Sequence, residues 1–243
     1  MYDTSMSNDT KQDMISDIME LLNAPVEPLH PDLAGYLHMD GPLGAPMLKH
    51  PLVFNMFHTE RENARVNACY EGKRDALHKA FRECNWTSYV FLHERPYRLD
   101  AFTMIKDRIT SNDAYWPLLG LIWTDSENIW ENRGAWYRRL TEPRRIADRQ
   151  TLMSVSDYNT LRDLPSSFKV YRGFNDDGDA EGLSWTLNAA KARWFATRYD
   201  QTGATVATGT VDRDDVIAYF SSRGEDEIVV LPENVQNMTL RSV

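Results

Sequence analysis

Cysteine is scarce in this 243-residue chain, which has only Cys69 and Cys84. The two stand fifteen positions apart, and neither has another cysteine or a histidine at the spacing of a metal site. We therefore expect two reduced thiols in a reducing compartment. Long apolar runs are also missing, and the polar residues 1–11 lack the basic and apolar segments of a signal peptide. These absences predict a soluble, cytoplasmic protein with no membrane partner.

Positive charge is in deficit, because 27 Lys and Arg residues stand against 36 Asp and Glu residues, for a net charge of -9. General electrostatic binding of nucleic acid normally needs a basic face, so the balance argues against that class of function. The six histidines all lie in the first hundred residues and form no metal-like cluster by spacing, so we expect no metal. Apolar residues make up 42% of the chain, enough for a core in one large or two small domains.

The first third of the chain mixes helical and irregular patterns. Apolar residues recur at helical spacing in residues 12–23, which predicts a short amphipathic helix after a loose tail. Residues 24–51 are rich in proline and glycine, so we expect an irregular wrap or a linker there. Residues 59–84 are again helical in pattern, and Gly72 can divide that helix in two. The aromatic segment 86–92 fits either a strand or a buried helix.

The middle of the chain predicts further helices. Residues 117–123 form a compact apolar run, after which Asp125 or Ser126 can cap a helix that continues to Leu140. Ser154 precedes another short helix. Tryptophans spaced by six or seven residues are typical of a packed helical core: Trp116, Trp123, Trp130 and Trp136.

From residue 168 the pattern changes to β. We expect strands at 168–174, 183–186, 206–211, 216–220, 227–231 and 238–241, with an alanine-rich helix at 188–198. The fold class is therefore α+β. We place a mostly helical N-terminal region of unknown role at 1–110 and a second domain at 111–243, with its β core at 168–243.

Arg172 and Gly173 stand at the end of the first of these strands. An arginine there can direct its guanidinium at a phosphate, and the glycine lets a ligand approach the backbone. The alternative, which we favour for these residues taken alone, is an edge-strand arginine in a surface ion pair.

Ser184, Trp185 and Thr186 stand just before the predicted helix 188–198. Thr186 is suited to cap that helix, since hydroxyl side chains accept hydrogen bonds from the first helical N–H groups. Ser184 can also serve as a hydrogen-bonding tether inside a cleft, and the two roles are compatible.

Consecutive carboxylates, Glu225 to Glu227, open an apolar strand. Side chains alternate along a strand, so Glu225 and Glu227 are expected to point the same way. Two carboxylates on one face can stabilise a cation or handle a proton. The alternative is a solvated acidic turn.

In this order, the arginine, the serine and the Glu-x-Glu pair resemble the arginine–serine–glutamate clade of ADP-ribosyltransferases, over about the last seventy-five residues. The match departs at Trp185, because family members commonly carry Ser-Thr-Ser where this chain has Ser-Trp-Thr. The resemblance implies a split β-sandwich with a central cleft for NAD. It implies mono-ADP-ribosyltransferase activity, in which NAD is cleaved at the nicotinamide glycosidic bond and ADP-ribose is transferred. NAD is then a substrate, and no metal is required.

The resemblance also assigns binding roles. It implies that NAD is held by Arg172, Gly173, Ser184, Trp185, Thr186, Phe195 and Arg198. Arg172 is expected on the phosphates or ribose, and Ser184 on the nicotinamide ribose. Phe195 would pack on the nicotinamide ring, with Arg198, three residues later on the same helical face, on a phosphate.

The catalytic roles implied by the resemblance fall to the two glutamates. Glu227 would stabilise the positive charge that develops on the ribose as nicotinamide leaves. Glu225 would orient or deprotonate the acceptor. The loop before the pair would help recognise the target, through Tyr219, Phe220 and Arg223. The alternative roles of these three are strand-end packing and a surface charge.

The acceptor stays open at this stage. The double glutamate is the family's usual mark of transfer to arginine in a protein, although some relatives with the same pair modify nucleic-acid bases. We expect NAD and a macromolecular acceptor, a protein first, as partners. The rivals are an NAD glycohydrolase, a non-catalytic interaction protein on the same fold, and a sugar hydrolase that leaves Arg172 and Ser184 unexplained. An effector acting in the cytoplasm of a bacterial host cell is a further hypothesis.

Overall fold

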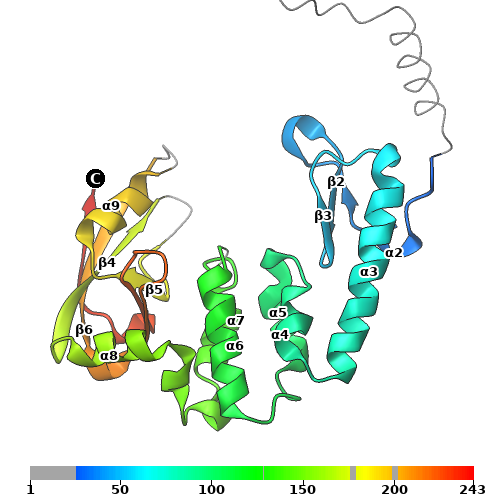
Figure 1. The fold of residues 1–243 in the computed structure, drawn as a ribbon. Helices are drawn as coiled ribbons and strands as arrows, with labels where there is room; N and C mark the ends of the chain where they lie inside the picture. The colour runs from blue at the N-terminus through cyan, green and yellow to red at the C-terminus, as the bar shows by residue number, and fades with distance from the viewer. Residues whose placement is uncertain (1–25, 128, 176–178, 199–201) are drawn as a thin grey trace, which may run out of the picture. The chain divides into compact units, whose positions relative to one another are not determined.

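The computed structural model describes residues 26–127, 129–175, 179–198 and 202–243 (Figure 1). The helix predicted at 12–23 and the tail before it lie outside these residues. The chain divides into two compact units, residues 1–78 and 79–243. This division concerns packing, and the expected functional division at residue 110 stays a prediction.

The described part of the N-terminal unit is built on a small antiparallel sheet and one long helix. Its elements are α2 (Pro31–Ala34), β1 (Leu37–His38), η1 (Pro42–Gly44), β2 (Met47–His50), β3 (Val53–Asn55), η2 (Glu60–Glu62) and α3 (Asn63–Arg82), which begins here. The strand order is β1-β2-β3. The irregular wrap expected at 24–51 therefore contains strands. Strand β2 can pair because Pro46 and Pro51 flank it and leave every backbone donor within it available.

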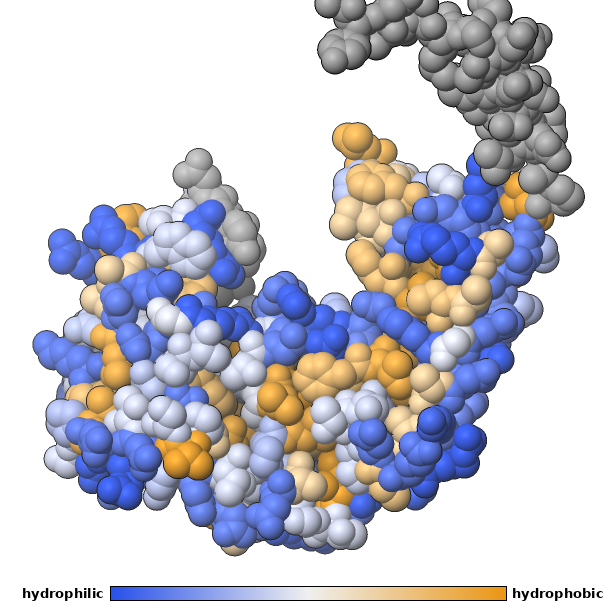
Figure 2. Space-filling model, viewed as in Figure 1, coloured by the Kyte–Doolittle hydropathy of each residue, from blue (hydrophilic) through white to orange (hydrophobic). Residues whose placement is uncertain are grey.

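Helix α3 runs through Gly72 without dividing, since nothing in its surroundings forces a break. Apolar side chains form a small core in the unit: Leu33, Leu48, Leu52, Val53, Val66 and Tyr70. Others are exposed around the three-stranded sheet, where Figure 2 shows apolar colour, and include Met39, Leu43, Phe54, Met56 and Phe57. The unit thus combines a small core with an apolar outer surface.

The middle of the chain is helical, in agreement with the sequence pattern. Its elements are α4 (Trp86–Phe91), η3 (Arg95–Tyr97), α5 (Arg98–Ile105), α6 (Asn112–Asp125), α7 (Arg133–Leu140), η4 (Pro143–Arg145), η5 (Arg149–Leu152) and α8 (Val155–Asp163). The aromatic segment 86–92 is a helix, begun by the side chain of Asn85. Ser154 caps α8 as predicted. None of the helices among the described ranges is long and apolar enough to cross a membrane.

The helix predicted from Asp125 or Ser126 to Leu140 is wrong at its start. Helix α6 ends at Asp125, and the N–H of Ser126 bonds back to the carbonyl of Trp123. The next helix begins only at Arg133. The apolar run 117–123 belongs to α6, which Ser111 caps, so the polar residues that follow terminate a helix instead of beginning one.

The C-terminal part is a six-stranded antiparallel sheet, as the coarse α+β prediction requires. Its elements are β4 (Ser167–Phe174), β5 (Ser184–Thr186), α9 (Ala189–Thr197), β6 (Thr205–Asp212), η6 (Arg213–Asp215), β7 (Val216–Phe220), β8 (Glu227–Val230), η7 (Pro232–Asn234) and β9 (Gln236–Ser242). The strand order is β7-β8-β5-β4-β6-β9. The main core joins the buried residues of this sheet to those of the middle helices.

The pairing between β4 and β5, at the centre of this sheet, is the shortest in the sheet. Strands β4 and β6 pair along their whole length, from Ser167 to Phe174. Strands β4 and β5 pair only at Tyr171 and Thr186. The sheet therefore consists of two three-stranded groups, β7-β8-β5 and β4-β6-β9, that part beyond one contact.

Candidate functional site

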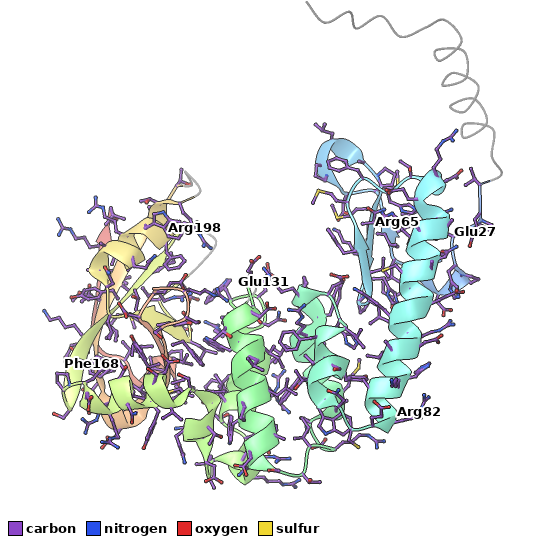
Figure 3. The ribbon with its side chains drawn as sticks, in the orientation of Figure 1. Glu27, Arg65, Arg82, Glu131, Phe168 and Arg198 are labelled. Carbon is purple, nitrogen blue, oxygen red and sulfur yellow. The ribbon has the colours of Figure 1, made fainter. Side chains whose placement is uncertain are left out.

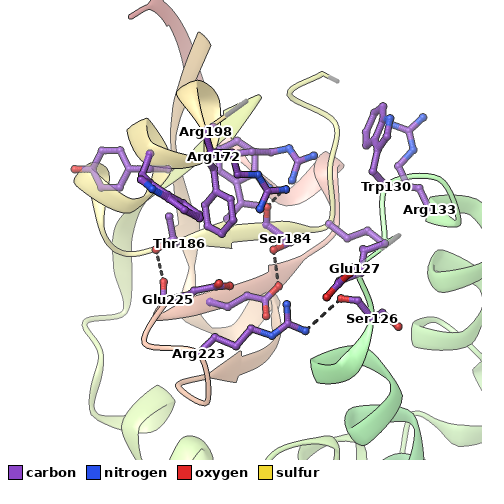
Figure 4. A pocket seen from close by; sticks show the side chains of 18 residues that line it. Ser126, Glu127, Trp130, Arg133, Arg172, Ser184, Thr186, Arg198, Arg223 and Glu225 are labelled. Carbon is purple, nitrogen blue, oxygen red and sulfur yellow. Dashed lines mark hydrogen bonds between the residues drawn. The ribbon is translucent and has the colours of Figure 1, made fainter. Parts of the chain in front are cut away.

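A cavity of about 480 Å³ lies where β4 and β5 part (Figure 4). Its walls come from β4, β5, α9, the segment 223–227 and the connection between α6 and α7. The predicted site residues on its wall are Arg172, Gly173, Ser184, Trp185, Thr186, Phe195, Arg198, Arg223, Glu225 and Glu227. The structure thus brings together residues that are up to 55 positions apart in the sequence (227 − 172 = 55).

Glu227 is a buried carboxylate at the start of β8, with 9% of its surface exposed. Strands β5 and β8 pair Thr186 with Glu227, which brings Ser184 to the same face. The Ser184 hydroxyl donates to Oε1 of Glu227 at 2.5 Å. Burial raises the pKa of Glu227 above its ordinary value, while the Ser184 hydrogen bond opposes that rise. The site therefore holds one fixed carboxylate in low-dielectric surroundings.

Glu225 reaches the cavity by a different route from the expected one. Strand β8 begins only at Glu227, and Asp226 has a left-handed backbone with φ of 45°. Strand alternation is therefore the wrong reason for placing both glutamates together. A turn brings Glu225 to the wall, where its carbonyl accepts a 2.5 Å hydrogen bond from the Thr186 hydroxyl. The nearby negative charge of Glu225 adds to the upward shift of the Glu227 pKa.

Arg172 is a partly buried residue whose guanidinium holds the backbone of the neighbouring segment. Its Nε donates to the carbonyl of Asp179 at 3.0 Å, and its Nη1 donates to the carbonyl of Ser184 at 2.8 Å. Burial lowers the pKa of Arg172 to about 10. A Cβ on Gly182 would lie 2.0 Å from the Arg172 Cζ, so the guanidinium rests directly against that glycine. Arg172 therefore positions Ser184 as well as facing the cavity.

Gly173 is required by the close approach of β4 to α9. A Cβ at this position would lie 1.8 Å from the carbonyl oxygen of Ala192 and 2.7 Å from the amide nitrogen of Ala196. Real Cβ atoms do not make such contacts with backbone, so only glycine fits here without movement. The sequence argument expected a ligand to approach the backbone here, whereas the neighbour that requires a glycine is α9.

Trp185 and Thr186 are mainly structural. Trp185 is 2% exposed, and its indole N–H donates to the carbonyl of Gly182 at 2.9 Å. The expectation that Thr186 caps α9 is wrong, because the side chain of Asn188 accepts from the N–H groups of Ala190 and Lys191. Thr186 instead accepts from the Asn188 N–H and donates to Glu225. It therefore ties the helix start to the glutamate turn.

Phe195 and Arg198 share one side of α9, as predicted. The Arg198 guanidinium lies 5.0 Å from the ring centroid of Phe195 and 5.7 Å from that of Trp194. Arg198 stands just beyond the C-terminal end of the helix (Figure 3). This end of α9 thus presents aromatic rings and a cation to the cavity, with Trp194 54% exposed.

The three residues expected to recognise a target do not lie together. Tyr219 and Phe220 are buried in β7 and do not line the cavity. The Tyr219 hydroxyl donates to Asp226 at 2.8 Å, and burial raises the pKa of Tyr219 to about 12. Arg223 does line the cavity, but it donates to the carbonyls of Thr124 and Ser126. Strand packing therefore accounts for Tyr219 and Phe220, and Arg223 ties the glutamate turn to α6.

The α6–α7 connection supplies a wall that the sequence argument missed. Ser126, Glu127, Ile129, Trp130 and Arg133 all line the cavity. The predicted tryptophan core is confirmed for Trp116, Trp123 and Trp136, which are fully buried. Trp130 differs, because its ring lies 4.7 Å from the guanidinium of Arg133 and 5.6 Å from that of Arg172. The available signal was the pair Ile129-Trp130 within an otherwise polar stretch.

Within the described ranges, no group of three or more His, Cys, Asp or Glu side chains is arranged to hold a metal ion. The cavity instead combines three carboxylates, four guanidiniums and five aromatic side chains that include Trp130, a set suited to an anionic ligand with aromatic groups. Comparison of the chain with protein-family models, curated proteins and solved structures gave no match.

Proposed function

We propose that the chain is a mono-ADP-ribosyltransferase that cleaves NAD at the nicotinamide glycosidic bond and transfers ADP-ribose to a protein. The observation that carries the proposal is the meeting of Arg172, Ser184 and Glu227 at one cavity, in the order along the chain that the resemblance implies. The single-residue join between β4 and β5 supports the finer fold proposal, a split β-sandwich.

Charge stabilisation by Glu227 is the centre of the proposed chemistry. As the bond from ribose C1′ to the nicotinamide nitrogen breaks, its electron pair leaves with nicotinamide, and positive charge develops on the sugar. A fixed carboxylate in low-dielectric surroundings stabilises that charge more strongly than water does. Ser184 orients the carboxylate through its 2.5 Å hydrogen bond. The ionised form of Glu227 is the active one, so the raised pKa predicts that activity falls as the pH is lowered.

Glu225 is the residue that we propose acts on the acceptor. It stands two positions before Glu227 on the same cavity wall, where it can orient or deprotonate an incoming nucleophile. A guanidinium acceptor suits two neighbouring carboxylates, so arginine is the side chain that we propose as target. The net charge of -9 argues against a nucleic-acid acceptor. The proposed site of action is the cytoplasm, including that of a bacterial host cell.

Labelled NAD tests this function. The wild-type chain and Glu227→Ala are incubated with NAD labelled in the adenylate moiety and with a cell lysate. Label on a discrete protein band with wild type, and none with the variant, is the expected result. Release of nicotinamide without a labelled acceptor would favour hydrolysis, and absence of both reactions would contradict the proposal. Glu225→Gln should reduce labelling while it preserves nicotinamide release.

A further inference from the structure

The arginines that line the cavity differ in how firmly their hydrogen bonds and ion pairs hold them. Arg172 and Arg223 each donate to two backbone carbonyls, which cannot move away independently of the fold, whereas Arg133 donates to one. Arg133, on the opposite wall, is 37% exposed and faces two carboxylates at longer range. Its Nη1 lies 3.5 Å from Asp179 and 3.6 Å from Glu181, and it donates to the Glu181 carbonyl at 3.2 Å.

Asp179 and Glu181, here called the acidic pair, are themselves solvent-accessible. Their side chains are 46% and 72% exposed, respectively. Exposed ion pairs of this kind contribute about 0.2–1 kcal/mol. A doubly charged diphosphate offers a guanidinium shorter, bidentate hydrogen bonds and more charge than either carboxylate does. We therefore expect Arg133 to exchange the acidic pair for such a ligand.

Trp130 keeps Arg133 available at the cavity wall. The Arg133 guanidinium lies over the Trp130 ring, whose other cationic neighbour is Arg172, and Figure 4 shows Trp130 and Arg133 together on the wall opposite the sheet. Stacking of this kind restricts a guanidinium to a plane while it leaves its donors free to turn. Arg133 can thus change partner without leaving the site.

We propose that Arg133 is a diphosphate-binding residue, and that the acidic pair competes with the ligand for it. This inference rests on the proposed function, since NAD is the dinucleotide that would carry the diphosphate. The α6–α7 connection then contributes to substrate binding, and the acidic pair sets the affinity by occupying Arg133 in the empty site.

Two classes of variant distinguish this proposal from a purely structural ion pair. The probe is ADP-ribose, titrated calorimetrically at low salt, with adenosine as the ligand that lacks phosphate. Arg133→Ala should weaken ADP-ribose binding by about 10- to 100-fold, the loss typical of a charged hydrogen bond, and leave adenosine unaffected. Asp179→Asn combined with Glu181→Gln should tighten ADP-ribose binding by about 2- to 5-fold.

The two classes of variant are expected to change the ADP-ribose affinity in opposite directions, and this distinguishes the proposal from a purely structural ion pair. If Arg133 only held the acidic pair in place, removing either side would change the affinity in the same direction, and that result overturns the proposal. Arg138→Ala, an exposed arginine on the same helix that does not line the cavity, and Asp214→Asn are the matched controls. Arg133→Lys should restore part of the affinity, and thermal unfolding checks that each variant folds.

The outcome also separates the inference from the proposed function. If the wild-type chain binds ADP-ribose through Arg133 but does not cleave NAD, the proposed enzyme activity is refuted and the proposed diphosphate subsite is retained. Wild type that cleaves NAD with an unchanged KM in Arg133→Ala refutes the subsite alone. Wild type that binds neither NAD nor ADP-ribose overturns both.

Discussion

Buried polar side chains have different roles in the two units. In the N-terminal unit, Asn67 accepts from the N–H of His30 at 2.8 Å and donates to the Glu27 side chain and the Pro28 carbonyl at 2.7 and 2.9 Å. The label of Glu27 in Figure 3 marks this segment beside the start of α3. Each of these bonds fixes a proline-containing segment that could not pair as a strand. The Asn67 side-chain amide therefore has a structural role, because it satisfies backbone hydrogen-bonding groups of this segment.

The cavity of the C-terminal unit contains buried groups whose charge is costly. Glu227 and Arg172 both have pKa values shifted toward the neutral form by burial. A chain selected only for stability would replace such groups by apolar ones, because an ionised group in low-dielectric surroundings is destabilising. The comparison teaches that charged groups with burial-shifted pKa values that line one cavity, more than burial of polar atoms alone, distinguish a candidate site from a structural network.

The largest expected effect on stability is that of Gly173→Ala. Its methyl group would overlap the Ala192 carbonyl, so β4 and α9 must separate, at a cost of about 3 kcal/mol. The control in the other unit is Gly72→Ala, which has no neighbour within 4 Å and should stabilise α3 by about 0.5–1 kcal/mol. Urea unfolding measures both, and equal stability of the two variants would contradict the packing described.

Ser184→Ala should lower the rate of NAD cleavage at neutral pH by about 10- to 100-fold, the worth of a hydrogen bond to a charged group. The Ser184 hydroxyl lowers the Glu227 pKa, so its removal raises that pKa further. The acid limb of the pH–kcat profile should therefore move to higher pH, with part of the rate recovered under alkaline conditions. A uniform loss at every pH would argue against this role.

Asn67→Ala should cost about 1 kcal/mol, because it leaves the His30 N–H and the Pro28 carbonyl without their partner in a partly buried place. NAD cleavage should be unchanged at temperatures where the variant stays folded. The test is thermal unfolding together with nicotinamide release, and lost activity in the folded variant would break the distinction between the two units.

Glu227→Gln should change the stability of the fold by less than Asn67→Ala does, and it should stabilise the chain. Because burial raises the folded-state pKa of Glu227, the native chain binds more protons than the unfolded chain above the ordinary value of 4.5. The contribution of Glu227 to stability is thus present below that pH and is lost as the pH rises through the shifted pKa. We expect Glu227→Gln to unfold at higher temperature than wild type at about pH 8. The difference should vanish in acid, and a less stable variant at pH 8 would contradict the assignment.

The site was more predictable from the sequence than the chain's local structure was. The resemblance carried by the order of Arg172, Ser184 and Glu227 implies one cleft, and β5 pairs with β8 so that the serine meets the glutamate. The turn at Asp226 could not be foreseen, since a left-handed aspartate leaves no pattern in the residues beside it. Glu225 was therefore placed correctly for a mistaken reason.

The wall of the cavity formed by the α6–α7 connection was missed for a different reason. Trp130 and Arg133 reach the cavity because α6 stops at Asp125 and the chain turns before α7, which depends on packing of the middle helices against the sheet. Spacing alone grouped Trp130 with the buried tryptophans. The strands between Pro42 and Asn55 were hidden in the same way, because proline density outweighed short apolar runs.

Nicotinamide release by the purified chain tests the central claim most directly. Wild type is incubated with NAD in the absence and presence of an arginine-rich acceptor protein, beside Glu227→Gln, and nicotinamide is quantified chromatographically. The account predicts release by wild type, faster with the acceptor, and a loss of at least about 100-fold in the variant, since one fixed charge-stabilising group is removed. Release that persists undiminished in Glu227→Gln, or no release by the folded wild-type chain, would contradict it.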